Sequence, residues 1–214
     1  MNQRILFPRL MMCLCLTSAL FAADYQSASF QQAYEDFMLV SSDEGGSSKK
    51  LVSDWQTIVD DDKRDPFTLV MLGSSQTLRG RDAWMPWSKM EHTETGLDTM
   101  AAAVRLLTPE HRTMSFQGMP VVFHVKTMAA VTFIQVPEFF GRYEDSFYLF
   151  QDVLSDEQFL ALPAPAKSFA YYYGIRAARA VEQETQADEW LETLAALPGD
   201  DRYIQSAREA ESAQ

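Results

Sequence analysis

The sequence predicts an all-α protein of stacked antiparallel helical hairpins, arranged as one compact domain that follows a secretory leader. Apolar residues recur three and four positions apart along most of the chain, which is the pattern of helices with one buried face. Prolines and glycines interrupt the chain between these stretches, where helices end. No succession of alternating strands and hairpin turns occurs in the sequence. These three observations favour helices nearly everywhere.

The amphipathic stretches appear in a regular order. They occupy residues 30–38, 51–59, 97–107, 140–154, 187–197 and 203–210. Gly45 and Gly46 separate the first two of them. Pro66 is expected to begin another helix with Asp65 as its N-cap, because an aspartate accepts hydrogen bonds from first-turn amides and proline suits the first helical position.

In the rest of the chain, helix-breaking residues mark further helix ends, and one stretch is apolar on most sides. Helices are expected to end or join at Pro109, at Pro163 with Pro165, and at Pro198 with Gly199. Residues 121–136 are apolar on most sides and predict a central, buried helix. Their β-branched residues leave a strand possible, but the length of the stretch favours a helix.

The last third of the chain carries a repeat pattern. A helix expected at 165–183 contains Tyr173 followed by Gly174, and a second helix carries Ala187 and ends before Pro198. The glycine and the proline lie 24 positions apart. This pattern resembles a tetratricopeptide repeat, although the small residue near the start of the second helix comes one position late. The resemblance implies helix pairs that stack into a superhelix, with the glycine allowing two helices to approach closely.

An earlier segment, 66–109, is similar to a stretched form of the same repeat. Leu72 and Gly73 lie in its first helix, and Thr108 and Pro109 end its second. The glycine-to-proline spacing is 36, so about a dozen residues are inserted between the two helices. The resemblance therefore implies degenerate repeats at 66–109 and 165–198 within a helical-repeat domain of residues 23–214.

The inserted residues, 79–90, hold the most distinctive motif and two of the four tryptophans. The stretch GRDAWMPW is similar to one in a group of uncharacterised exported bacterial proteins with helical repeats, which implies an architecture and a location but no activity. Tryptophan and arginine are favoured at binding hot spots, so Arg81, Asp82, Trp84, Trp87 and Lys89 are the candidate binding residues. Burial is the more ordinary explanation: the two tryptophans would fill a groove between hairpins, and Arg81 and Asp82 would pair.

Aromatic residues are dense at 139–150 and at 171–173. Consecutive aromatic side chains cannot all face one core, so some are expected between layers or on the surface. Core packing is the main interpretation of these two segments. An exposed aromatic groove is the alternative.

The first residues predict a secretory leader. Arg4 and Arg9 precede an uncharged, mostly apolar run from Leu10 to Ala23 that ends in small residues. These 14 positions fall short of the roughly 20 apolar residues that a membrane span needs. We expect cleavage after Ala22, which makes residues 1–22 a signal peptide and the mature protein periplasmic or secreted. Both cysteines, at 13 and 15, lie inside the leader, so the mature chain is expected to form no disulfide and no thiolate metal site.

The chain is acidic, with 30 acidic residues against 18 lysines and arginines and a net charge of −12. Binding to phosphate backbones depends on neutralisation by lysine and arginine. Nucleic acid and anionic membrane surfaces are therefore poor candidates as partners. A well-solvated surface is the plainer explanation of the acidity.

Catalytic and metal-binding patterns are sparse. The histidines are His92, His111 and His124, and none stands three or four positions from another, as a helical metal site would require. No phosphate-binding or dinucleotide-binding glycine loop occurs, so no cofactor is expected. If the protein is an enzyme, Glu91, His92 and His124 are the candidates for acid–base work.

These observations predict a non-catalytic binding or scaffold protein of the cell envelope that uses a helical-repeat surface for protein or peptide partners. Two alternatives stay open, an accessory subunit of an envelope transport complex and an enzyme with an unrecognised site. The sequence predicts no nucleic-acid partner and no membrane span in the mature chain. It leaves the oligomeric state open.

Overall fold

The computed structural model describes residues 24–61 and 65–212. Its α-helices are α1 (Ala28–Ser41), α2 (Ser48–Asp61), α3 (Pro66–Asp82), α4 (Pro86–Arg105), α5 (Val121–Gln135), α6 (Tyr143–Leu154), α7 (Glu157–Leu160), α8 (Ala164–Ala180), α9 (Glu184–Ala196) and α10 (Arg202–Ser212). Two single-turn 3₁₀ helices, η1 (Pro109–Arg112) and η2 (Glu138–Phe140), lie in connections. The expected signal peptide, its cleavage site and both cysteines lie outside the described residues.

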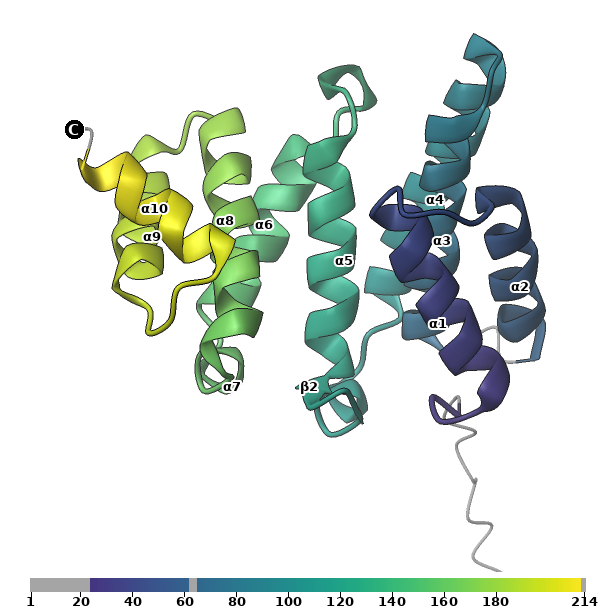
Figure 1. Cartoon of the computed structure of the whole chain (residues 1–214), viewed down its shortest axis with the longest axis horizontal. Coiled ribbons are helices and arrows are strands. Elements are labelled where there is room, and N and C mark those ends of the chain that lie inside the picture. The colour runs from purple at the N-terminus through teal and green to yellow at the C-terminus, as the bar shows by residue number, and fades with distance from the viewer. Residues whose placement is uncertain (1–23, 62–64, 213–214) are drawn as a thin grey trace, which may run out of the picture.

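The helices run alternately up and down and form antiparallel hairpins, as Figure 1 shows for α1–α2, α3–α4, α5–α6 and α8–α9. Neighbouring hairpins contact one another in chain order: α2 lies against α3, α3 and α4 against α5, α6 against α8, and α9 against α10. The predicted all-α architecture of stacked hairpins is therefore confirmed.

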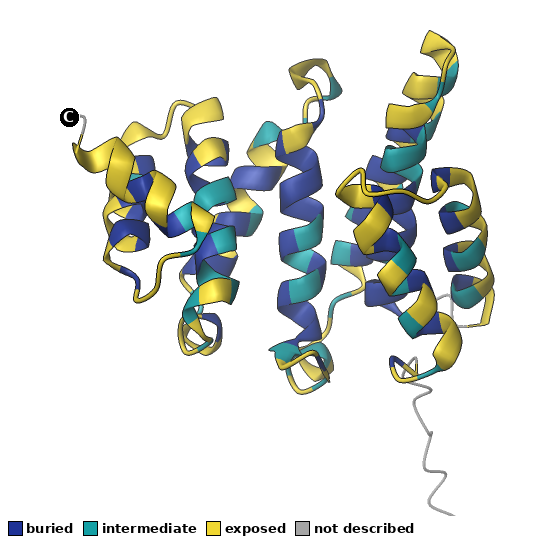
Figure 2. Cartoon of the chain, in the orientation of Figure 1, coloured by how far each residue is buried: buried dark blue, intermediate teal, exposed yellow. Residues whose placement is uncertain are grey.

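Two hydrophobic clusters lie on opposite faces of α5. The N-terminal cluster joins α1 to α4 with Val125, Ala129 and Phe133 of α5. The C-terminal cluster joins α6 to α10 with Phe123 and Ala130 of α5. Figure 2 shows α5 buried along most of its length. The prediction of a central, buried helix at 121–136 is confirmed, and the strand alternative is wrong.

A small β-hairpin precedes α5 and was not predicted. Strand β1 (Ser115–Phe116) pairs antiparallel with β2 (Met119–Pro120), with Phe116 opposite Met119. The turn residues Gln117 and Gly118 have φ of 47° and 79°, a combination that suits a two-residue hairpin. Strands of two residues are too short to show alternation in a sequence.

The N-cap that the sequence predicts for α3 is present. Asp65 caps α3 by accepting hydrogen bonds from the amides of Phe67 and Thr68, and the hydroxyl of Tyr25 donates to the same carboxylate. Two details differ from expectation. Met38, the last residue of the amphipathic stretch 30–38, is 50% exposed, because Val40 takes the inward position in the last turn of α1. Helix α8 spans Ala164–Ala180 rather than the expected 165–183.

Glycines set the close packing of the hairpins. A Cβ added to Gly73 of α3 would lie 2.6 Å from Met100 Cγ and 2.7 Å from Gly96 O of α4. A Cβ on Gly174 of α8 would meet the ring of Trp190 of α9 at 3.3 Å. Both predicted glycine contacts are thus present. The assignment to the tetratricopeptide family stays a prediction.

The dense aromatics divide between core and surface. Tyr171 is buried in the C-terminal cluster, and Tyr172 and Tyr173 pack half-buried beside Tyr203 of α10. Phe147 and Phe150 are buried, whereas Phe139 of η2 is 69% exposed. Core packing is therefore the main role of both segments, with Phe139 and Tyr148 as clear exceptions.

Candidate functional site: the tip of hairpin α3–α4

Hairpin α3–α4 reaches beyond the neighbouring helices at one end of the molecule (Figure 1). Only residues 83–85 connect its helices, with Ala83 and Met85 in extended conformation and Pro86 at the first position of α4. Most of the residues 79–90 are helical. The expected insertion between the helices is therefore mainly a lengthening of both helices, because proline at the first position allows α4 to begin immediately after a short turn.

The two tryptophans of the motif lie on the surface of this tip. The side chain of Trp84, in the turn, is 90% exposed, and that of Trp87, in the first turn of α4, is 65% exposed. The interpretation that they fill a groove between hairpins is wrong, because the lengthened helices carry both residues past the neighbouring elements. Met85 and Met90 are also exposed and extend the apolar surface.

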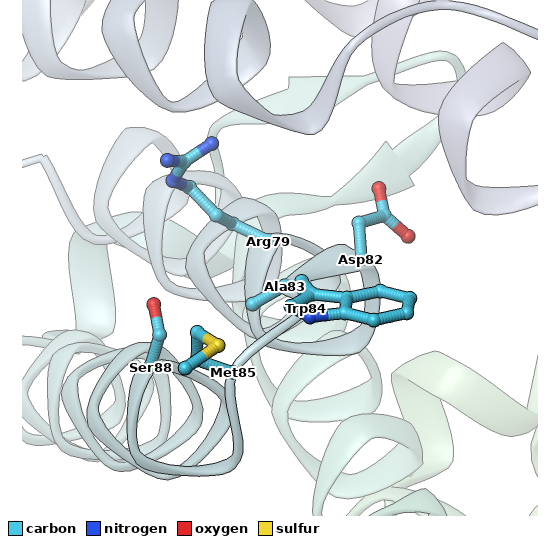
Figure 3. Close-up of a pocket in the computed structure, with 6 residues that line it drawn as sticks. All are labelled: Arg79, Asp82, Ala83, Trp84, Met85 and Ser88. Carbon is cyan, nitrogen blue, oxygen red and sulfur yellow. The ribbon is translucent and has the colours of Figure 1, made fainter.

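An open hollow of about 300 Å³ lies at the side of the tip. Figure 3 shows the residues around it, which are Arg79, Asp82, Ala83, Trp84, Met85 and Ser88. Arg79 forms no ion pair with any residue that the structure describes. The hollow therefore combines the Arg79 cation, the Asp82 carboxylate, an indole ring and a thioether, which are features of a contact surface.

Arg81 and Lys89 hold the tip in place. One guanidinium nitrogen of Arg81 donates to Val40 O at 3.0 Å, and others pair with Asp43 at 3.0 Å and Asp82 at 2.8 Å. Lys89 Nζ donates to Arg81 O at 2.9 Å. The contacts of Arg81 tie the tip to the end of α1 and the α1–α2 connection, so Arg81, Asp82 and Lys89 brace the tip while they remain exposed on its surface. The predicted pairing of Arg81 with Asp82 is confirmed.

The charges at the base of the tip stabilise one another. Burial alone would raise the pKa of Asp82. Hydrogen bonds from Arg81 and Ser48, together with the positive charges of Arg81 and Lys89, outweigh this effect and hold the pKa below its usual value. Asp82 is therefore ionised near neutral pH, where it pairs with Arg81.

The residues proposed for catalysis do not meet. Glu91 and His92 lie on α4, whereas His124 lies in the first turns of α5, where its Nε2 donates to Phe116 O at 2.8 Å. His111 caps η1, with its Nδ1 accepting from the amide of Thr108 at 2.9 Å. No group of histidine, cysteine and acidic residues able to hold a metal ion occurs in the described part of the chain. Among the described residues, Glu91, His92 and His124 therefore form no hydrogen-bonded or ion-paired cluster.

Three residues that line the hollow or extend the exposed surface of the tip were not among the candidates from the sequence. Arg79, Met85 and Met90 belong to the motif, but their exposure depends on where the neighbouring helices end.

A second hollow, of about 250 Å³, contains Arg112 and Lys126, but Asp156 and Asp152 pair with these two cations. It therefore offers no free charge to a ligand.

Comparison with protein-family models, with curated proteins and with solved structures finds no match for this chain. Among the described helices, none is both long enough and apolar enough to cross a membrane. The functional inference therefore depends on the geometry of the tip.

Proposed function

We propose that this chain is a non-catalytic binding or scaffold protein of the cell envelope, which engages a protein or peptide partner through its helical surface. The tip of hairpin α3–α4 is the primary contact. One observation carries the proposal: two tryptophans are held in the open, 90% and 65% exposed, on a hairpin that projects from the domain.

The chemistry of the tip supports a protein partner. Exposed aromatic side chains cost hydration free energy in the isolated protein and recover it when a partner covers them. Tryptophan and arginine are the side chains most often found at the energetic centre of interfaces, and the tip carries Trp84, Trp87 and Arg79 together. Because Arg81 braces the base, the tip loses little conformational entropy on binding.

An affinity capture from the envelope fraction tests this function. Trp84→Ala should abolish capture of the partner, because a central aromatic anchor typically contributes about 2 kcal/mol or more. Tyr148→Ala is the matched control, since this aromatic side chain is 61% exposed on α6. Circular dichroism and thermal melting should be unchanged in both variants. Retention of the partner by a folded Trp84→Ala variant would contradict the proposal.

A further inference from the structure

We infer that one end of this molecule docks on the surface of a lipid bilayer, with Trp84 and Trp87 of the α3–α4 tip and Phe139 of the α5–α6 connection inserted among zwitterionic headgroups. This inference goes beyond the proposed function. It shares the tip with that function, but a bilayer needs no partner protein, and Phe139 belongs to the lipid contact alone.

The exposed apolar side chains are unevenly distributed. In the described part of the chain, ten large hydrophobic side chains are exposed, and five of them lie on the tip of hairpin α3–α4 or on the α5–α6 connection. Four belong to the tip, namely Trp84, Met85, Trp87 and Met90, and the fifth is Phe139. The three aromatic members are exposed by 90%, 65% and 69%. Exposed apolar side chains that gather in one region, unlike single ones, indicate a surface that is covered in use.

The topology places both connections at the same end. Helices α3 and α5 run in the same direction, so the turn that follows α3 and the 3₁₀ helix η2 that follows α5 lie at the same end of the molecule (Figure 1). Figure 2 shows both connections largely exposed. The two contacts come from separate hairpins and project outward. A flat surface touches two such projections at once, whereas the cleft of a partner protein suits a single projecting tip.

The residue types suit the interface between lipid and water. Tryptophan is enriched at the level of the headgroups, where its ring is apolar and its N–H can meet water or lipid oxygen. Residues 83–90 contain Lys89 and no acid. Around Phe139 the charges are mixed, with Glu138 beside it and Arg142 paired with Asp98 and Asp145.

Net charge decides which lipid is favoured. At −12 the whole chain is repelled by an anionic bilayer, so attraction between opposite charges cannot hold it there. Burial of apolar area at the headgroup level requires no lipid charge. Docking is therefore apolar, it operates on zwitterionic bilayers, and it is insensitive to salt there.

Flotation with phosphatidylcholine vesicles tests the inference. Every variant is made in the same form, so that the apolar stretch at 10–23 contributes equally. The double variant Trp84→Ser with Trp87→Ser should lower the partition coefficient by about tenfold or more, since it removes two of the largest apolar side chains. Phe139→Ser should lower it by about threefold. Tyr148→Ser, the matched control on α6, should leave it unchanged.

The measurement separates lipid from protein partners. Wild-type chain that floats with protein-free vesicles and loses flotation in the Phe139 and tryptophan variants establishes the bilayer contact. Failure of the wild type to float overturns the inference, and capture of a protein through Trp84 under those conditions leaves the proposed function intact. Binding that needs phosphatidylglycerol and disappears with added salt also overturns it, because charge would then be the cause.

Discussion

At the scale of single residues, His124 shows how burial fixes a protonation state. Its ring stacks on Phe67 with centroids 5.0 Å apart and meets Phe116 edge-on at 5.7 Å. Burial in these aromatics lowers the pKa of His124, and the hydrogen bond to Phe116 O opposes this effect only partly. The imidazole is therefore neutral in the folded protein near neutral pH, with the proton on Nε2 because Phe116 O accepts from it.

This arrangement predicts a loss of stability in mild acid. The unfolded chain takes up a proton at His124 near the usual pKa of about 6.5, whereas the folded chain resists it to lower pH. Stability is therefore complete above that value and falls below it, by at most about 1.4 kcal/mol per pH unit.

Urea unfolding at about pH 7 and about pH 5 measures this loss of stability, because the two pH values lie on either side of the usual histidine pKa. His124→Gln, which can still donate to Phe116 O, should reduce the difference between the two midpoints. Asp82 and Asp156, whose pKa values lie below the usual range, titrate in more acidic solution and leave this window unaffected. Equal pH dependence in the variant and the wild type would show that His124 is not its source.

Sequence reasoning at this scale succeeded where the chemistry is local. Asp65 was predicted as an N-cap because its acceptor and the amides of Phe67 and Thr68 are neighbours in the chain. Burial in a groove is the more ordinary expectation for Trp84, and the structure shows this side chain exposed. A spacing of three residues shows that two side chains share a face of a helix, but not whether another element covers that face.

At the scale of elements, small residues control the long hairpin α3–α4. Gly73, Gly80 and Gly96 are buried in the contact between its helices. A Cβ added to Gly96 would lie 2.5 Å from Gly73 O and 2.7 Å from Thr77 Cγ2, and the first of these is backbone that cannot move aside cheaply. The hairpin is thus closely packed toward its tip, which keeps the tip rigid.

Gly96→Ala should therefore destabilise the protein by about 2 kcal/mol, as is usual for overpacking. Helix propensity alone predicts the opposite sign, because alanine is favoured over glycine by about 1 kcal/mol inside a helix. Urea unfolding measures the change. Thr95→Ala, one residue earlier and exposed, is the control and should be neutral or slightly stabilising. A stabilised Gly96→Ala variant would contradict the close contact.

Most elements could be predicted because apolar periodicity and breakers are strong signals over ten or more residues. The β-hairpin at 115–120 escaped because it has two residues in each strand. The length of the α3–α4 hairpin escaped for a different reason. The comparison with a shorter repeat placed the extra residues between helices, whereas Pro86 continues the helical structure almost at once.

At the scale of the whole molecule, hairpin stacking could be predicted, but the arrangement of its surfaces could not. Which connections lie at the same end depends on every preceding reversal of the chain, so the shared end of the α3–α4 turn and the α5–α6 connection becomes visible only in the structure. The division of the core into two clusters depends likewise on which hairpins contact α5. The sequence shows only that α5 is apolar on most sides.

The shared helix predicts that both halves of the protein unfold together. Helix α5 supplies buried side chains to each cluster, so melting of either half uncovers one face of it. Replacement of both tip tryptophans by phenylalanine leaves Trp55 in the N-terminal cluster and Trp190 in the C-terminal cluster as fluorescent probes. Further replacement of either one isolates the other. The two probes should report the same urea midpoint.

Phe133→Ala in α5 sharpens this prediction, because the ring is 2% exposed and belongs to the N-terminal cluster. Its loss should cost about 3–5 kcal/mol and should lower the midpoint equally at Trp55 and at the distant Trp190. Phe139→Ala, which removes an exposed ring, is the control and should leave both midpoints in place. A midpoint lowered at Trp55 alone would mean that α5 couples the halves only weakly, and that the C-terminal hairpins keep their fold when the N-terminal cluster melts.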